Sequence, residues 1–203
     1  ERRLGEAVER LRAIAPQRVH ARTCDVTKQD EVDALVSTAI ATLGHVDVLV
    51  NNAGLGGTAT IVEIGSFKGR STSALAYGCR GTERHVYALD TFDGNDNDFD
   101  TRGFRDEFDA NIARGGLTAY VTAIPGRSLE TAQTWERPID LLFIDGSHDF
   151  DDVVADFHSF VRHVRPGGLV AAHDVLPTWE GVDRAWRDVI APTLIDTGAC
   201  ATL

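Results

Sequence analysis

Residues 62–72 read Val-Glu-Ile-Gly-Ser-Phe-Lys-Gly-Arg-Ser-Thr: an apolar strand, a turn with two glycines and the start of a helix. Gly65 and Gly69 have no Cβ, so the backbone of the turn can come close to a ligand. The first residues of the helix offer N–H groups that have no partner within the helix. A tight turn between a strand and a helix needs similar glycines without any ligand. The pattern therefore predicts the local fold first and a binding site second.

Glu63 puts a carboxylate at the end of this strand. A pyrophosphate is bound by N–H donors and repelled by a nearby negative charge, whereas a ligand with an amino group is attracted by that charge. S-adenosylmethionine has both an amino group and a positively charged sulfonium. The turn therefore favours S-adenosylmethionine over a dinucleotide.

Alternating strands and helices fill the chain from residue 60 onward, and glycine- or proline-containing breaks separate their apolar runs. This alternation predicts an α/β fold: a Rossmann-like, doubly wound, mainly parallel sheet of about seven strands, with helices on both faces. Ligands then bind at the carboxyl ends of the strands. We expect strands at 61–64, 85–89, 119–124, 139–144 and 169–172, a hairpin at 194–197 and 200–203, and helices at 69–77, 104–113, 129–135, 150–164 and 182–190.

Polar residues end the second and third of these strands. Asp90 follows the second strand, about 20 residues after the turn, where a carboxylate accepts hydrogen bonds from ribose hydroxyls in dinucleotide-type folds. Ser128 follows the third strand, in the Gly-Arg-Ser segment 126–128, where a hydroxyl could meet the edge of an adenine. The alternatives are a helix or turn cap for Asp90 and an ordinary loop serine for Ser128.

Acidic residues and histidines end the fourth and fifth strands. Asp145 and His148 follow the fourth strand, and His173 and Asp174 follow the fifth. Since parallel strands end at the same edge of a sheet, Asp145 and Asp174 can share one hard cation through oxygen ligands. His148 can act as general base on an acceptor hydroxyl, because the pKa of histidine lies near neutral pH. The alternatives are solvated strand-end caps for the aspartates and a surface-loop position for His148, and we interpret His173 as structural.

With these residues in order, the chain from about residue 60 to 203 resembles the class I S-adenosylmethionine-dependent methyltransferases. It is most similar to the metal-dependent sugar O-methyltransferases of the macrocin type, and cephalosporin hydroxylase-like proteins share much of the pattern. The resemblance implies in-line transfer of the methyl group from the sulfonium to an acceptor hydroxyl. The matching segments are 62–72, Ala-Leu-Asp-Thr-Phe 88–92, 126–128, Ile-Asp-Gly-Ser-His 144–148, Arg-Pro-Gly-Gly 165–168 and His-Asp 173–174.

The resemblance also implies roles for individual residues. His148 would be the base, assisted by Asp145, and a divalent metal, in the first place magnesium, would be held by Asp145 and Asp174. Relatives can have glutamate directly before the second aspartate, where this chain has His173, so the third metal ligand stays open. The acceptor would be a sugar, polyketide or phenolic hydroxyl of secondary metabolism. Contacts to S-adenosylmethionine are implied for Glu63, Gly65, Ser66, Gly69, Ser71, Asp90, Thr91, Phe92, Ser128 and Asp145.

The N-terminal part of the chain does not share this resemblance. Arg-Thr-Cys-Asp-Val-Thr 22–27 and Val-Asp-Val-Leu-Val-Asn-Asn-Ala-Gly 46–54 resemble the middle of a short-chain dehydrogenase/reductase of the polyketide ketoreductase kind. We expect strands at 18–26 and 46–50 around a helix that begins near Asp30. Residues 1–57 would then be a βαβ fragment and 58–203 the methyltransferase domain.

The fragment lacks the residues that a reductase needs. Its family uses a Tyr-x-x-x-Lys pair as proton donor, and neither Lys28 nor Lys68 has a tyrosine four residues earlier. Carbonyl reduction is therefore excluded by the sequence. A natural fusion, an artificial chimera or a sequence error would each produce such a join.

The charge and composition limit the class of partner. The 203 residues have a net charge of −11 and a pI near 5.0, which repels nucleic acids and anionic membranes. We therefore expect a small-molecule partner, with homo-oligomerisation left open. Three cysteines without metal-ligand spacing indicate reduced thiols and a cytoplasmic protein, and no apolar run reaches the roughly 18 residues of a membrane span.

Two readings other than a methyltransferase stay open at this point: a hydroxylase-like relative and a non-catalytic, nucleotide-binding scaffold. The chain starts at Glu1 and contains no methionine, so we expect its first residue not to be a natural start.

Overall fold

The computed structural model describes residues 8–9, 12, 20–21, 24, 29–43, 58–93 and 103–194. The chain divides into two compact units, Glu1–Asp47 and Val48–Leu203. The first contains α2 (Gln29–Leu43), the helix expected near residue 30. Several expected features lie wholly or mostly outside the described residues: the strands at 18–26 and 46–50, the Asn-Asn-Ala-Gly segment 51–54, and most of the acidic loop before residue 103.

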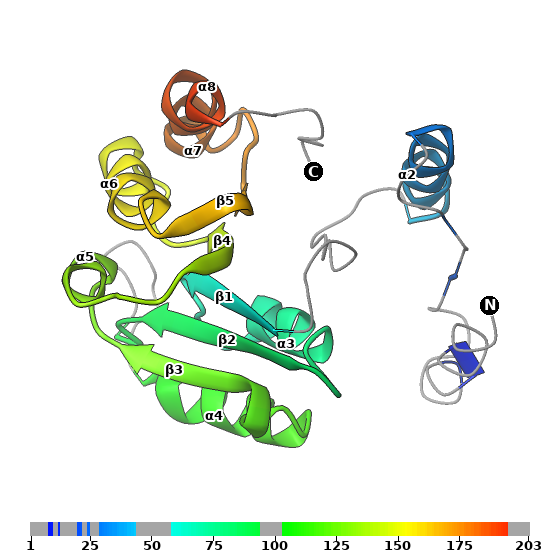
Figure 1. The fold of residues 1–203 in the computed structure, drawn as a ribbon, viewed down its shortest axis with the longest axis horizontal. Coiled ribbons are helices and arrows are strands. Elements are labelled where there is room, and N and C mark those ends of the chain that lie inside the picture. The colour runs from blue at the N-terminus through cyan, green and yellow to red at the C-terminus, as the bar shows by residue number, and fades with distance from the viewer. Residues whose placement is uncertain are drawn as a thin grey trace. The chain divides into compact units, whose positions relative to one another are not determined.

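The second unit is built on a five-stranded sheet in which all neighbouring strands are parallel (Figure 1). Their order is β3-β2-β1-β4-β5, so the chain winds outward from β1 on one side and then from β4 on the other. Ligands of such sheets bind where the winding reverses, at the carboxyl ends of the two central strands. The strands are β1 (Thr58–Ile64), β2 (Glu83–Asp90), β3 (Val121–Pro125), β4 (Ile139–Ile144) and β5 (Val164–Ala172).

Helices connect these strands. They are α3 (Arg70–Tyr77), α4 (Phe104–Arg114), the 3₁₀ turn η1 (Thr118–Tyr120), α5 (Ser128–Gln133), α6 (Phe150–Val161), α7 (Glu180–Ala185), the π-helical turn η2 (Trp186–Ile190) and α8 (Ala191–Thr193). None of the helices in the described part of the chain combines the length and the apolar character that a bilayer crossing requires.

The predicted doubly wound α/β fold is confirmed, but the predicted number of strands is wrong. The described residues form five strands rather than about seven. The two additional strands were expected in the hairpin after residue 193. Of that hairpin only Leu194 is described, and it follows α8.

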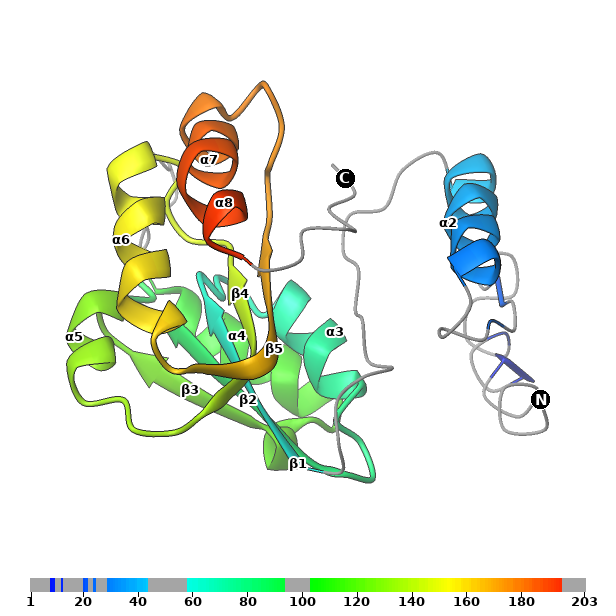
Figure 2. The ribbon, with the colours of Figure 1, turned by 45° about the horizontal axis from the view of Figure 1, so that its top comes forward.

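Alternation along β1 divides the core into two layers. Val62 and Ile64 pack with residues of α6 and α7, whereas Ile61 packs with residues of α3 and α4. Successive side chains of a strand point to opposite faces of the sheet, so an apolar run such as β1 covers both layers. Figures 1 and 2 show α3 and α4 on one face and α5, α6 and α7 on the other.

The last strand begins earlier than the sequence predicts. We expected a helix to residue 164 and a strand at 169–172, but α6 ends at Val161 and β5 begins at Val164. Val164 pairs with Ile139, and the register shifts before Leu141, so the Arg-Pro-Gly-Gly segment is an irregular part of the strand. Proline is tolerated there because β5 lies at the edge of the sheet. The helix expected at 182–190 likewise begins earlier, at Glu180, and changes to a π-helical turn at Trp186.

Candidate functional site

The turn after β1 is closed by neighbouring protein atoms. Gly65 has a φ of 86°, its N–H donates a hydrogen bond to the Leu89 carbonyl (2.9 Å), and a Cβ there would lie 2.0 Å from the carbonyl oxygen of Asp145. Gly69 has a φ of 80°, and a Cβ there would lie 2.9 Å from the ring of Phe108. Both glycines are therefore required by packing, whereas the sequence had suggested close approach of a ligand.

Glu63 is a fully buried carboxylate at the base of this turn. Its Oε2 accepts a hydrogen bond from the Thr72 hydroxyl, while its Oε1 is buried and has no hydrogen-bond partner. Burial raises the pKa of Glu63, the hydroxyls of Ser71, Thr72 and Ser66 oppose this, and the charge of Asp90 adds to it. The Ser66 hydroxyl is also buried without a hydrogen-bond partner. The turn thus contains two polar atoms that the protein leaves unsatisfied, which is costly unless a ligand completes them.

Asp90 connects the ends of three strands. Its Oδ2 accepts the N–H of Phe67 and its Oδ1 the N–H of Phe92, each at 2.7 Å, and its backbone carbonyl accepts the N–H of Gly126 at 2.9 Å. Among the implied cofactor contacts beside it, Thr91 is exposed, whereas the Phe92 ring is buried against Phe108 with centroids 5.2 Å apart. Asp90 therefore positions the turn after β1, and the Phe92 side chain belongs to the core.

Ser128 has a partner that the sequence did not indicate. Its hydroxyl donates a hydrogen bond to the Oδ1 of Asp156 on α6 (2.5 Å). Asp156 is buried, and burial raises its pKa to about 6, with the Ser128 hydrogen bond opposing the rise and Asp152 adding to it. The link joins the amino end of α5 to the middle of α6.

The structure brings together the residues at the ends of β4 and β5. The Asp174 Oδ2 lies 3.0 Å from the His148 Nε2 and 3.0 Å from the His173 Nδ1, and the Asp145 Oδ1 lies 3.2 Å from the same His173 nitrogen. Ligand atoms of Asp145, His173 and Asp174 all lie within 4.8 Å of one another, a spacing that could hold a metal ion. We call Asp145, His148, His173 and Asp174 the Asp–His cluster.

Burial makes one carboxyl of the Asp–His cluster a weak acid. The pKa of Asp145 is raised to about 7, first by burial and then by the charges of Glu63 and Asp174, while His173 lowers it. A cation between the carboxylates would relieve this repulsion. His148, in turn, lies against the half-exposed ring of Trp179, with centroids 4.0 Å apart and an interplanar angle of 31°.

Three residues of this region were missed by the sequence analysis. Asp156 could have been found, because it interrupts the apolar face formed by Val153, Phe157 and Phe160 in an amphipathic helix. Thr72 and Trp179 had no such signal. Thr72 reaches Glu63 across a turn, and Trp179 reaches His148 from a loop after β5.

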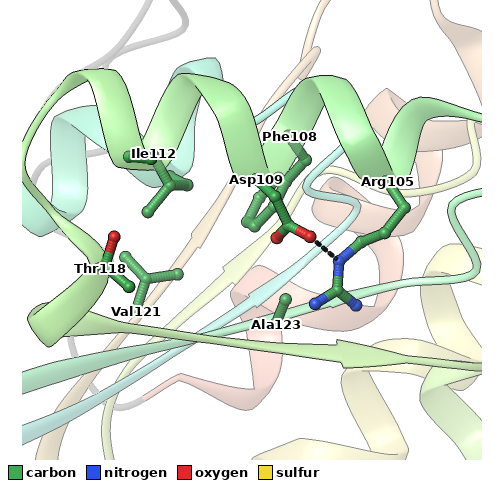
Figure 3. A pocket seen from close by; sticks show the side chains of 8 residues that line it. Arg105, Phe108, Asp109, Ile112, Thr118, Val121 and Ala123 are labelled. Carbon is green, nitrogen blue, oxygen red and sulfur yellow. Dashed lines mark hydrogen bonds and ion pairs between the residues drawn. The ribbon is translucent and has the colours of Figure 1, made fainter.

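A separate pocket of about 350 Å³ lies between α4 and β3 (Figure 3). An ion pair between Arg105 and Asp109, 2.9 Å long, lies in its wall. None of the predicted site residues lines it. The lining residues are Arg105, Phe108, Asp109, Ile112, Ala113, Thr118, Val121 and Ala123.

Comparison with solved structures matches the second unit to methyltransferases. The O-methyltransferase NovP superposes with a TM-score of 0.52 at 18% identity, over 66% of this chain and 64% of that chain. The methyltransferase PaMTH1 of Podospora anserina, solved with S-adenosylhomocysteine, superposes with a TM-score of 0.51 at 20% identity, over 68% and 64%. CalS11, a TDP-rhamnose 3'-O-methyltransferase of calicheamicin biosynthesis, gives 0.50 at 18% identity, over 86% and 78%. At these identities the likeness shows the fold.

The N-terminal part matches a different family, as the sequence indicated. A short chain dehydrogenase model matches residues 1–73. An indene-carboxyl-CoA reductase of Mycobacterium tuberculosis is 48% identical over 64 residues, which is 32% of this chain and 24% of the reductase. The 7alpha-hydroxysteroid dehydrogenase of Escherichia coli is 46% identical over 50 residues, 25% of this chain and 19% of the dehydrogenase. The chain thus spans about a quarter of the length of these relatives or less.

The larger match concerns the unit that holds the site. A family model described as "Methyltransferase domain" matches residues 62–175, more than half of the chain. This range begins in β1, before Glu63, and ends just after Asp174, so it contains the turn, Asp90 and the whole Asp–His cluster. The resemblance inferred from the strand ends is confirmed, and the chain belongs to the methyltransferase domain family.

Proposed function

We propose that the chain is an S-adenosylmethionine-dependent O-methyltransferase that acts on a hydroxyl group of a small molecule, with a divalent cation at the Asp–His cluster. One observation carries the proposal: the buried, half-satisfied carboxylate of Glu63 and the Asp–His cluster lie at the same edge of the sheet. Gly65, two residues after Glu63, contacts the backbone of Asp145 directly. A cofactor held by the turn would therefore present its reacting group beside the cluster.

The residues of the turn suit S-adenosylmethionine. An ammonium group would satisfy the unpartnered Oε1 of Glu63, and the Ser66 hydroxyl could bond to the same part of the cofactor. Each oxygen of Asp90 accepts one backbone N–H, so each retains a lone pair for a ribose hydroxyl. When bound, S-adenosylmethionine supplies a methyl group on a sulfonium that leaves without needing a proton.

The donor set of the Asp–His cluster suits a divalent cation. Asp145 and Asp174 would hold it through oxygen, with His173 as the third ligand through nitrogen. Such an ion lowers the pKa of a hydroxyl that it contacts. This assignment extends the implied pair of aspartates by the residue that replaces an acid in some relatives.

His148 is placed to accept the proton of the acceptor hydroxyl. Its Nε2 faces a carboxylate oxygen of Asp174, which favours the tautomer with the proton on Nε2 and leaves Nδ1 as the basic nitrogen. The Trp179 ring restricts rotation of the imidazole and offers an aromatic surface to a ring-shaped acceptor. A sugar is the acceptor class to test first, since the similar structure CalS11 is a TDP-rhamnose 3'-O-methyltransferase.

Calorimetric titration of S-adenosylmethionine and of NADPH into the chain tests the proposal. We expect micromolar binding of S-adenosylmethionine and none of NADPH. Asp90→Ala should abolish the binding, while Asp93→Ala, an exposed acid in the same loop, should leave it unchanged. Transfer of a radiolabelled methyl group to sugar, polyketide and phenolic acceptors then identifies the acceptor class. Failure of the wild-type chain to bind S-adenosylmethionine would refute the proposed function.

A further inference from the structure

Asp156 is a buried acid that the proposed chemistry does not use. It lies on the apolar face of α6, is 7% exposed and accepts a hydrogen bond from the Ser128 hydroxyl. A Cβ on Gly146 would lie 3.4 Å from its Oδ2, so the carboxylate sits beneath the loop that follows β4. A buried carboxylate destabilises the fold unless its partners compensate, and helix α6 needs only an apolar residue here. Its placement next to the candidate cofactor site therefore calls for a functional reason.

The carboxylate determines which way the Ser128 hydroxyl points. A hydroxyl has one hydrogen to donate and can accept two hydrogen bonds, whereas an ionised carboxylate can only accept. Since the pKa of Asp156 is raised only to about 6, the group is mostly ionised at neutral pH. The hydrogen of Ser128 is then committed to Asp156, and any other atom that faces the Ser128 oxygen must be a donor.

The Ser128 loop lies next to the candidate ribose site. The Gly126 N–H donates to the backbone carbonyl of Asp90, 2.9 Å away, and Ser128 follows two residues later. The base of a nucleoside is joined directly to its ribose, so the base extends from Asp90 toward this loop. At the same ring position adenine has an amino group, which donates, and hypoxanthine has a carbonyl oxygen, which accepts.

We propose that Asp156 is a positioning residue that holds Ser128 as a hydrogen-bond acceptor and thereby selects adenine over hypoxanthine in the cofactor. The inference rests on the proposed function, since it assigns one end of the same cofactor site. The selectivity arises because a hypoxanthine carbonyl would face an oxygen that has no hydrogen to offer.

Calorimetric titration with S-adenosylhomocysteine and with S-inosylhomocysteine tests this. We expect the wild-type chain to bind the adenosyl compound about ten-fold more tightly, and Asp156→Ala to reduce this ratio by about threefold or more, because the freed Ser128 can then donate to the carbonyl. General damage to the site would weaken both compounds alike and leave the ratio unchanged. Asp151→Ala, an exposed acid on the same helix, is the matched control and should keep the wild-type ratio.

Ser128→Ala provides a second variant in case Asp156→Ala does not fold, which circular dichroism would reveal. It should also reduce the ratio, because no oxygen remains to accept from the adenine amino group. Equal binding of the two compounds by the wild type, or an unchanged ratio in the folded variants, would overturn the inference and leave the proposed function intact. Binding of neither compound by the wild type would overturn the proposed function itself.

Discussion

The backbone of Asp145 occupies the space that a side chain at Gly65 would need, since a Cβ there would lie 2.0 Å from the Asp145 carbonyl oxygen. The first strand-end turn and the loop after β4 therefore fit together only with glycine at this position. The contact links the candidate cofactor turn to the Asp–His cluster and makes both sensitive to a single methyl group.

Gly65→Ala should destabilise the fold by about 3 kcal/mol, because it adds a backbone clash to a left-handed φ. Gly81→Ala is the matched control: Gly81 has a φ of 71°, but nothing lies within 4 Å of a Cβ there. It should cost only about 1 kcal/mol, the price of the φ alone. Urea unfolding of both variants gives the comparison. Equal losses would show that the contact with Asp145 has no energetic weight.

His173 should decide which metal the Asp–His cluster prefers. Imidazole nitrogen suits transition metals better than magnesium, so we expect His173→Asp to reduce the preference for cobalt(II) over magnesium by about ten-fold. Calorimetry gives both affinities, and the visible absorption of cobalt(II) reports its ligands independently of activity. His158→Asp, an exposed histidine on α6, should leave the preference unchanged. A preference that survives His173→Asp would remove His173 from the ligand set.

Asp156 should make the protein less stable as the pH rises. Its pKa increases from an ordinary 3.8 to about 6 on folding, so the folded state binds the proton more tightly than the unfolded state. The resulting penalty is absent below the unfolded pKa, grows as the pH rises toward the folded pKa and is complete above it, where it reaches at most about 3 kcal/mol.

Asp156→Asn removes this titration and keeps an oxygen that accepts from Ser128. Relative to the wild type, the variant should therefore gain free energy of unfolding between about pH 4 and about pH 8, measured with urea at both values. Asp151→Asn, an exposed acid on α6, should show no such gain. A pH-independent difference between Asp156→Asn and the wild type would contradict the assignment of the raised pKa.

Trp179 should affect the acceptor and not the cofactor. Its ring lies against His148 and is 42% exposed, so Trp179→Ala removes an aromatic surface beside the candidate base. We expect KM for the acceptor to rise by about ten-fold, with the affinity for S-adenosylhomocysteine unchanged, and Trp179→Phe to restore most of the loss. Steady-state kinetics with the acceptor identified in the screen, together with calorimetry, separates the two effects. A loss of cofactor affinity in Trp179→Ala would place the ring at the cofactor instead.

The sequence by itself determined the class of fold and the edge of the sheet at which the candidate site lies. Apolar runs and glycine breaks are local signals, so β1, β2 and β4 were found close to their observed bounds. Glu63, Asp90, Asp145 and Asp174 each end such a run or follow it directly, and the carboxyl ends of parallel strands meet at one edge. Their gathering therefore needed no knowledge of side-chain packing.

Only the tertiary structure decided which side chains meet within that site. Ser128 reaches Asp156 across 28 residues, and His173 turns toward Asp145 and Asp174 instead of being merely structural. The early start of β5 and the number of strands were equally beyond the sequence. Strand pairing and side-chain contacts depend on free energies shared between distant segments, whereas a periodic pattern records only what each segment prefers on its own.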